Sequence, residues 1–115
     1  IVAVIILVST WGLMRESADL VLHAVPKGID ARQVRAVLEE LPGVERVHDL
    51  HIWAVSTTET ALTAHLVKPE IADDDGLLAE ASRILRDQFQ IGHSTLQIER
   101  NSQTMNCREA HPNCI

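Results

Sequence analysis

The 115-residue sequence predicts an α+β domain of ferredoxin-like αββαβ topology, a two-layer sandwich preceded by a truncated transmembrane helix. Three observations predict it. The first 14 residues are almost entirely apolar, two later segments carry apolar residues at helical spacing, and three segments alternate apolar and polar residues as strands do. Two helices on one face of a three-stranded sheet leave the other face free.

Residues 1–14 (IVAVIILVSTWGLM) are apolar all round, and as a helix they would span about 21 Å. A bilayer core needs about 20 residues, so this segment is too short to cross it. A signal peptide is disfavoured because no basic residue precedes the segment and no small-residue cleavage site follows it. A buried core helix is the other alternative. We interpret residues 1–14 as the C-terminal part of a transmembrane helix, with Trp11 at the interface and Arg15 at the cytoplasmic exit.

Residues 15–28 are expected to continue the helix or to form a linker, which Pro26 and Gly28 interrupt. Asp30 is then a suitable N-cap for a helix that runs to about Leu41. The apolar positions of that helix follow the i, i+3, i+4, i+7 pattern, and they are Val34, Val37, Leu38 and Leu41.

Strands and a second helix complete a domain expected over residues 29–101. The ranges expected are 44–55 and 61–68 for the first two strands, 69–76 for an acidic loop, a helix that ends near Gln90, 94–100 for the third strand and 102–115 for a polar tail. The acidic run Asp73–Asp75 is either a calcium-like site or, as we favour, the cap of this helix.

Composition excludes several classes of function. The formal net charge of −6 argues against a nucleic-acid partner, because such proteins present a basic stripe. Both cysteines lie in the last nine residues, so the chain is not a secreted disulfide-stapled domain. The sequence contains no nucleophile elbow, P-loop or other catalytic arrangement, and we expect no enzyme activity.

Strict period-2 alternation collects metal-binding residue types on the face of the sheet away from the core. The apolar residues of each strand mark the buried face, so the residues between them share the other face. That face would carry Asp49, His51, His65, His93 and Glu99. Imidazole and carboxylate groups from adjacent strands suit zinc, which takes three or four N, O or S ligands.

Two questions stay open at this face. His48 falls on the core side of the first strand unless it lies at the strand entrance or in a bulge. A solvated polar face with scattered histidines is the alternative to a metal site.

The tail contains a second group of candidate ligands, in the segment CREAHPNC. Cys107, His111 and Cys114 stand within eight residues of one another and offer three soft or borderline ligands. The alternatives are free thiols without a metal, or a local disulfide, which a cytoplasmic location disfavours.

Four stretches of the sequence resemble the cation diffusion facilitator family, especially its cobalt–zinc–cadmium resistance branch. WGLMRESADLVLHAVP is similar to the end of that family's last transmembrane helix and its linker. GVERVHDLHIWAVS, TAHLV and HSTLQIE are similar to the three cytoplasmic strands. Together they cover nearly the whole chain in the family's order.

The resemblance implies the cytoplasmic domain of an antiporter that expels Zn²⁺, Cd²⁺ or Co²⁺ in exchange for protons, conferring metal resistance. Such proteins lie in the inner (plasma) membrane, and their cytoplasmic domains form a metal-responsive homodimer. By motif position, the resemblance implies that His48, His65, His93 and Glu99 are metal ligands, and more weakly Asp75, Cys107 and Cys114. It favours His48 where alternation favoured His51, which is the fallback together with Asp49.

A free-standing metallochaperone or small-ligand regulatory module is the alternative function. It would share the fold, but would be expected to begin with a helix cap instead of IVAVIILVSTWGLM.

Overall fold

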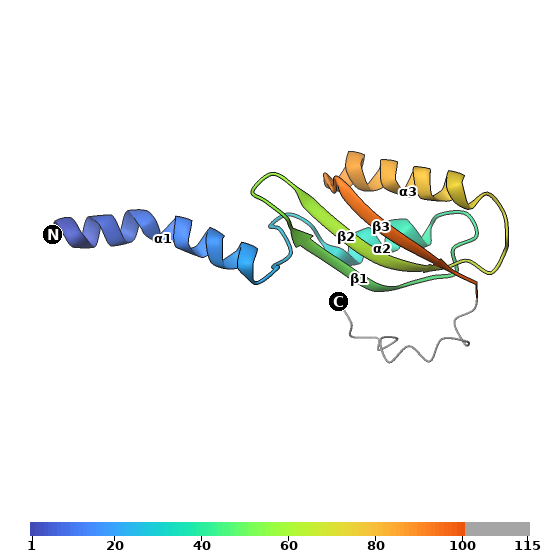
Figure 1. Ribbon diagram of the computed structural model, residues 1–115, viewed down its shortest axis with the longest axis horizontal. Helices are drawn as coiled ribbons and strands as arrows, with labels where there is room; N and C mark the ends of the chain where they lie inside the picture. The colour runs from blue at the N-terminus through green and yellow to red at the C-terminus, as the bar shows by residue number, and fades with distance from the viewer. Residues whose placement is uncertain (101–115) are drawn as a thin grey trace.

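A computed structural model describes residues 1–100 as an N-terminal helix followed by the predicted order of helix, strand, strand, helix and strand (Figure 1). The predicted order is confirmed, and the predicted bounds differ from the observed ones by a few residues at most. The elements are α1 (Val2–Val21), α2 (Ala31–Glu39), β1 (Arg46–Ala54), β2 (Thr60–Val67), α3 (Asp74–Phe89) and β3 (His93–Glu99).

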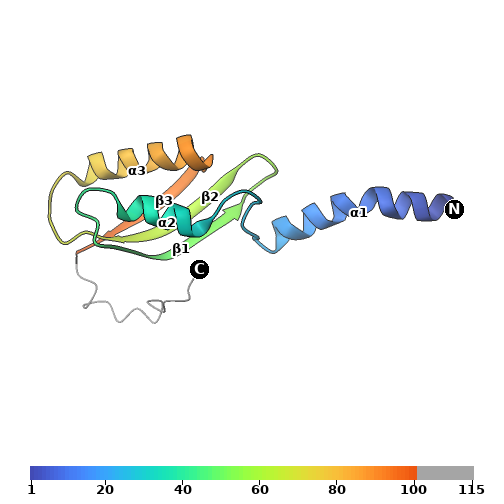
Figure 2. The same cartoon turned by 180° about the vertical axis from the view of Figure 1, so that it is seen from behind.

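The three strands form one mixed sheet in the order β1-β2-β3. β1 and β2 are antiparallel, whereas β2 and β3 are parallel because α3 carries the chain back between them. Helices α2 and α3 cover the same face of the sheet, as the views from both sides show (Figures 1 and 2). The predicted two-layer α+β arrangement is therefore confirmed, and no helix among residues 1–100 covers the opposite face of the sheet.

The core lies between the sheet and the two helices, and the alternation of β1 and β2 explains it. Apart from an irregularity in the middle of β1, alternate residues of these strands point toward the helices, where apolar side chains are removed from water. The helices contribute one apolar stripe each. The largest fully buried side chains are Leu38, Leu50, Leu62, Leu66, Leu85, Ile91, Val34 and Val47.

Helix α1 projects away from this domain and buries none of its residues (Figure 1). It runs past Met14 to Val21, so the first residues after Arg15 continue the helix, which was one of the two expectations for them. Its apolar side chains are exposed, Trp11 at 56% and Leu7 at 64% of their full accessibility. Within residues 1–100, no helix is both long enough and apolar enough to span a membrane.

Aspartates begin both helices of the domain. Asp30 accepts a hydrogen bond from the Arg32 N–H at 2.9 Å, which confirms it as the predicted N-cap of α2. Asp73 accepts one from the Gly76 N–H at 3.1 Å at the start of α3. The capping interpretation of the acidic run is thus confirmed at Asp73.

Two cations hold the loop between β2 and α3, a feature that the sequence analysis missed. The ammonium of Lys68, which is only 4% exposed, donates to the Glu70 carbonyl at 3.1 Å, to Asp74 Oδ1 at 2.9 Å and to the Ala72 carbonyl. The Arg100 guanidinium donates to the Lys68 carbonyl at 3.1 Å and pairs with the other carboxylate oxygen of Asp74. The carbonyls of this loop therefore accept hydrogen bonds from the side chains of Lys68 and Arg100, the residues that directly follow β2 and β3.

Substitution of Asp74 by asparagine is expected to remove a pH-dependent part of the stability. Hydrogen bonds from Lys68, and then from Arg100, hold the pKa of the Asp74 carboxyl below its ordinary value. A carboxyl whose pKa is lower in the folded state stabilises the fold above its unfolded pKa of about 3.9. That contribution is lost as the pH falls through the folded-state pKa.

Urea unfolding between pH 7 and pH 3 measures this effect. The difference in free energy of unfolding between the wild type and Asp74→Asn should be constant near neutral pH and should shrink below about pH 4. Asp75→Asn, a change at an exposed acid in the same helical turn, is the matched control and should leave the profile unchanged. A wild-type advantage that persists undiminished to pH 3 would contradict the assignment.

Candidate metal centre

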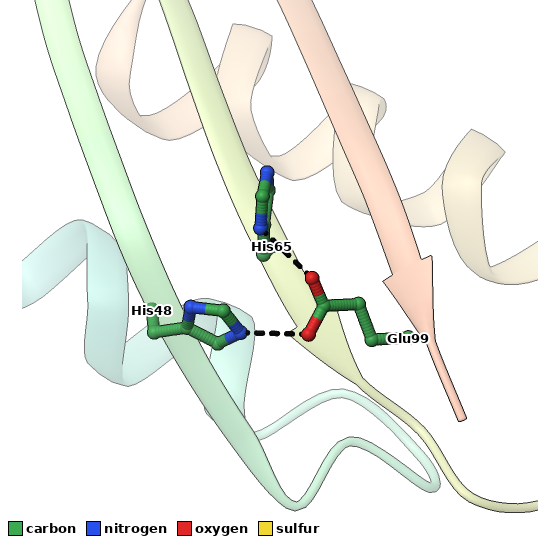
Figure 3. A group of neighbouring side chains, drawn as sticks. All are labelled: His48, His65 and Glu99. Carbon is green, nitrogen blue, oxygen red and sulfur yellow. Dashed lines mark hydrogen bonds and ion pairs between the residues drawn. The ribbon is translucent and has the colours of Figure 1, made fainter. Parts of the chain in front are cut away.

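Three side chains from three different strands converge on the free face of the sheet (Figure 3). His48 of β1 donates from Nε2 to Glu99 Oε2 at 2.9 Å, because a carboxylate can only accept. Nδ1 of His65, on β2, lies 2.9 Å from the other oxygen of the same carboxylate. The three residues each offer one ligand atom, and these atoms lie within 4.8 Å of one another. We call His48, His65 and Glu99 the sheet-face triad.

The register of the sheet explains how His65 and Glu99 reach the triad. His65 pairs with Gln97 across β2 and β3, and Val67 pairs with Glu99 in the next row on the same face. His48 pairs directly with His65 across β1 and β2. Their rings meet edge to face with centroids 5.2 Å apart.

A β-bulge in β1 brings His48 to this face. His51 pairs with Thr63 and His48 with His65, so between these pairs β1 has one residue more than β2. Asp49 is that extra residue, with a left-handed φ of 51°, while Leu50 next to it is buried in the core. The bulge therefore turns both His48 and His51 toward the free face, which uninterrupted alternation does not allow.

The triad is largely removed from water, and its polar atoms are not fully satisfied. The side chain of Glu99 is 5% exposed, that of His48 11% and that of His65 21%. Within residues 1–100, Nδ1 of His48 and Nδ1 of His65 are buried without a hydrogen-bond partner. The His65 nitrogen lies close to a Glu99 oxygen but is not aligned for a hydrogen bond. A buried imidazole nitrogen beside a buried carboxylate is an arrangement that a cation would satisfy.

The residue types and distances fit a borderline-soft divalent cation. Metal–ligand bonds of about 2.0–2.1 Å in a tetrahedral site put ligand atoms about 3.3 Å apart. The three ligand atoms of the triad lie within 4.8 Å of one another, and side-chain rotation can bring them to the tetrahedral separation. Two imidazoles and one carboxylate suit zinc and its neighbours better than Mg²⁺ or Ca²⁺, which prefer all-oxygen sites.

Asp49 and His51, the fallback candidates, lie beside the triad. His51 donates from Nε2 to Asp49 Oδ1 at 2.9 Å, and its side chain is 49% exposed. The second oxygen, Asp49 Oδ2, lies 3.8 Å from Nε2 of His65. The geometry thus favours His48 over His51 as a member of the triad and places Asp49 in contact with it.

His93 shares the free face but not the position of the triad. It begins β3 and pairs with Ala61, four residues before His65 on β2, or about 13 Å along the strand. Its side chain is 62% exposed, and its Nε2 lies 3.9 Å from Glu59. The structure therefore does not bring His93 together with the triad within one chain, because alternation identifies a face whereas the register decides which residues on that face meet.

The remaining candidates also lie apart from the triad or outside the described chain. Asp75 is exposed in the first turn of α3, in the helical layer. Cys107, His111 and Cys114 lie outside the described residues. Sequence reasoning missed Gln97, which donates from its side-chain amide to Glu99 Oε1 at 3.3 Å. The sequence could have indicated it, because Gln97 lies two residues before Glu99 on β3 and therefore on the same face.

Residues 26–101 match a protein family described as "Cation efflux protein, cytoplasmic domain". Curated relatives agree with this match. The chain is 38% identical over 109 residues to a probable zinc transporter protein of Dictyostelium discoideum, covering 95% of this chain and 20% of the relative. It is 36% identical over 95 residues to the metal cation efflux system protein CzcD of Cupriavidus metallidurans, covering 82% of this chain and 30% of the relative. The chain thus spans a fifth to a third of these relatives.

A solved structure shares the fold. The metal-bound C-terminal domain of the CzcD transporter from Cupriavidus metallidurans superimposes with a TM-score of 0.57 at 36% sequence identity. The superposition covers 62% of this chain and 99% of that domain. The similarity therefore extends over the whole of the metal-bound relative.

Proposed function

This chain belongs to the cation efflux protein family, whose cytoplasmic domain residues 26–101 match, and we propose that it is the metal-sensing part of a divalent-cation exporter. The sheet-face triad binds Zn²⁺, or Cd²⁺ or Co²⁺, and the bound ion regulates export. The family match identifies a cytoplasmic domain of cation efflux proteins, and the geometry offers a possible metal site in it. The proposal adds the identity of the ion, its ligands and its regulatory effect.

The single observation that carries the proposal is the convergence of His48, His65 and Glu99. Three strands each supply one side chain, and the ligand atoms lie within 4.8 Å of one another on the face of the sheet opposite α2 and α3. His65 Nδ1, buried and without a hydrogen-bond partner in the described part of the chain, lies beside the Glu99 carboxylate and supports a cation between them. The metal-bound relative of the same fold supports the same conclusion.

We propose that the active form is a homodimer. Three ligands from one chain leave a fourth tetrahedral position for water, for the tail or for a second copy. The net charge of −6 makes two metal-free domains repel each other, and a bound dication would reduce that repulsion. The ion then favours one of two dimer arrangements by its difference in affinity for them, typically about 1–3 kcal/mol.

The membrane context is part of the proposal. The exposed apolar side chains of α1 support a membrane environment for residues 1–14, with 15–28 joining them to the domain and the domain lying in the cytoplasm. We place the whole protein in the inner (plasma) membrane, where it exchanges the metal ion for protons. A relative from Mus musculus, 32% identical over 107 residues, is named a proton-coupled zinc antiporter, which supports this coupling.

Calorimetric titration of the 115-residue chain in a mild detergent tests the proposal. The two cysteines are first replaced (Cys107→Ser and Cys114→Ser) so that the tail thiols cannot supply the signal, and we call this protein the Cys-free variant. We expect Zn²⁺ to bind with a dissociation constant at or below the micromolar range and Mg²⁺ to give no binding at the same concentrations.

Two outcomes oppose the proposal. Absence of zinc binding at micromolar concentrations would remove its physical basis. Equal affinity for Zn²⁺ and Mg²⁺ would indicate an unselective acidic surface, because a mixed imidazole–carboxylate site discriminates between these ions.

A further inference from the structure

Asp49 has an unusual backbone conformation for a residue inside a strand. Four non-glycine residues among residues 1–100 have positive φ angles: His23, Asp49, Asp73 and Gln90. Asp73 and Gln90 are the caps of α3, and His23 follows the end of α1, so these three lie at helix boundaries. Only Asp49 lies within an element. Left-handed residues and bulges in strands concentrate at functional sites, where they re-aim side chains.

The conformation of Asp49 brings its carboxylate against His65 of the neighbouring strand. Asp49 Oδ2 lies 3.8 Å from His65 Nε2, while His65 Nδ1 lies 2.9 Å from Glu99 Oε1. The imidazole of His65 is therefore flanked by two carboxylates, one at each ring nitrogen. The Asp49 side chain is only 19% exposed, so water competes weakly for its contact with the ring.

From this geometry we propose that Asp49 is a positioning residue that fixes the tautomer and orientation of His65, an inference that rests on the proposed metal site. A histidine that binds a metal through one nitrogen usually donates its other N–H to a carboxylate or carbonyl. With the ion bound at Nδ1, Asp49 accepts from His65 Nε2–H. Nδ1 is the ring nitrogen that faces the Glu99 carboxylate of the triad, at 2.9 Å.

His51 leaves Asp49 one oxygen for this role. His51 Nε2 donates to Asp49 Oδ1 at 2.9 Å, so Oδ2 is the oxygen that faces His65. The 3.8 Å separation is longer than a hydrogen bond, and a small rotation of the imidazole would close it. A cation bound at Nδ1 makes Nε2–H a stronger donor and favours that rotation.

Two variants of Asp49 separate a role of its carboxylate from a role of its backbone. Asp49→Gly removes the carboxylate and keeps the left-handed φ, which glycine adopts freely. Thermal unfolding of metal-free Asp49→Gly should therefore match or exceed that of the parent, while zinc affinity falls about 10- to 100-fold. Asp49→Asn keeps a side-chain oxygen that can accept from Nε2–H, and it should retain most of the affinity. All are compared in the Cys-free variant by calorimetric titration of Zn²⁺.

A spectroscopic readout on the metal-free protein distinguishes positioning from direct ligation. The ¹⁵N chemical shifts of the His65 ring should report a larger fraction of the Nε2–H tautomer in the parent than in Asp49→Gly, where only Glu99, at Nδ1, still attracts the ring proton. His93→Ala, a change on the same face about 13 Å along the strand from His65, should leave zinc affinity unchanged.

Each contrary outcome is informative. Unchanged zinc affinity in Asp49→Gly would overturn the inference while leaving the proposed metal site intact. Loss of affinity in Asp49→Asn as large as in Asp49→Gly, with the same His65 tautomer in all variants, would make Asp49 a ligand and overturn positioning. If the parent binds no zinc, the proposed function fails instead.

Discussion

Replacing His65 by alanine is expected to lower zinc affinity about 100-fold in the Cys-free variant. Structural zinc sites with four ligands bind with about 10–16 kcal/mol, which corresponds to about 3 kcal/mol for each ligand. Because about 1.4 kcal/mol corresponds to a factor of ten, loss of one ligand gives about two orders of magnitude. His65 is the central strand's contribution to the triad and pairs with His48, so its loss removes one of the three ligand atoms.

His93→Ala is the matched control for this prediction. It removes the same side chain from the same face of the sheet, but at the opposite end of β3 from Glu99. Zinc titration of His93→Ala should give the parent affinity. If instead His93→Ala weakens binding as much as His65→Ala while Glu99→Ala leaves it unchanged, the ion is bound elsewhere and the triad is not the site.

The fold was predictable from local patterns because each element carries its own signal. Asp30 and the apolar stripe of α2 mark a helix, and the alternation in β2 marks a half-buried strand. The same alternation predicted that His65 and Glu99 share a face, since residues two or four apart on one strand point the same way. The parallel pairing of β2 with β3 then brought them together, and that register cannot be read from either strand alone.

The bulge at Asp49 is the main feature that local patterns could not predict. One extra residue in β1 reverses the assignment of faces for everything before it, so strict alternation placed His48 in the core layer. Asp is among the residues that adopt left-handed angles most readily, but that preference alone does not locate a bulge. The separation of His93 from the triad was also not predictable, because it depends on the register, which pairs His93 with Ala61 at one end of β3 and Glu99 with Val67 at the other.

The Lys68 and Arg100 contacts were missed because most of their partners are backbone carbonyls. A lysine before Pro69 at the end of a strand has the pattern of an exposed residue, yet its ammonium is enclosed by the loop that follows. The Lys68 N–H also donates to the Glu99 carbonyl at 2.8 Å. The loop contacts and the triad therefore share the end of β3, and a sequence pattern gives no sign of that connection.

Removal of zinc is expected to lower the melting temperature of the Cys-free variant by about 10–20 °C. A ligand that binds only the folded state stabilises it by about 2.7 kcal/mol at a free concentration of 100 times its dissociation constant. For a domain of 60–100 residues, 1 kcal/mol shifts the melting temperature by about 4–8 °C. The matched domain, residues 26–101, falls in this size class, and domains this small keep only a small margin of stability from their own core.

Thermal unfolding with zinc and then with excess chelator measures this effect, and Glu99→Ala tests whether the triad produces it. Glu99 is 6% exposed and is the one member of the triad that contacts both histidines, so its loss should abolish most of the zinc-dependent shift. The zinc-dependent shift of Glu99→Ala is measured against the melting temperature of its own metal-free form. This separates lost zinc binding from a change in intrinsic stability. A shift of the same size in Glu99→Ala and in the parent would mean that zinc stabilises the fold from another place on the chain. The folding energy and the metal site would then be independent, whereas the convergence of three strands on one carboxylate requires them to be coupled.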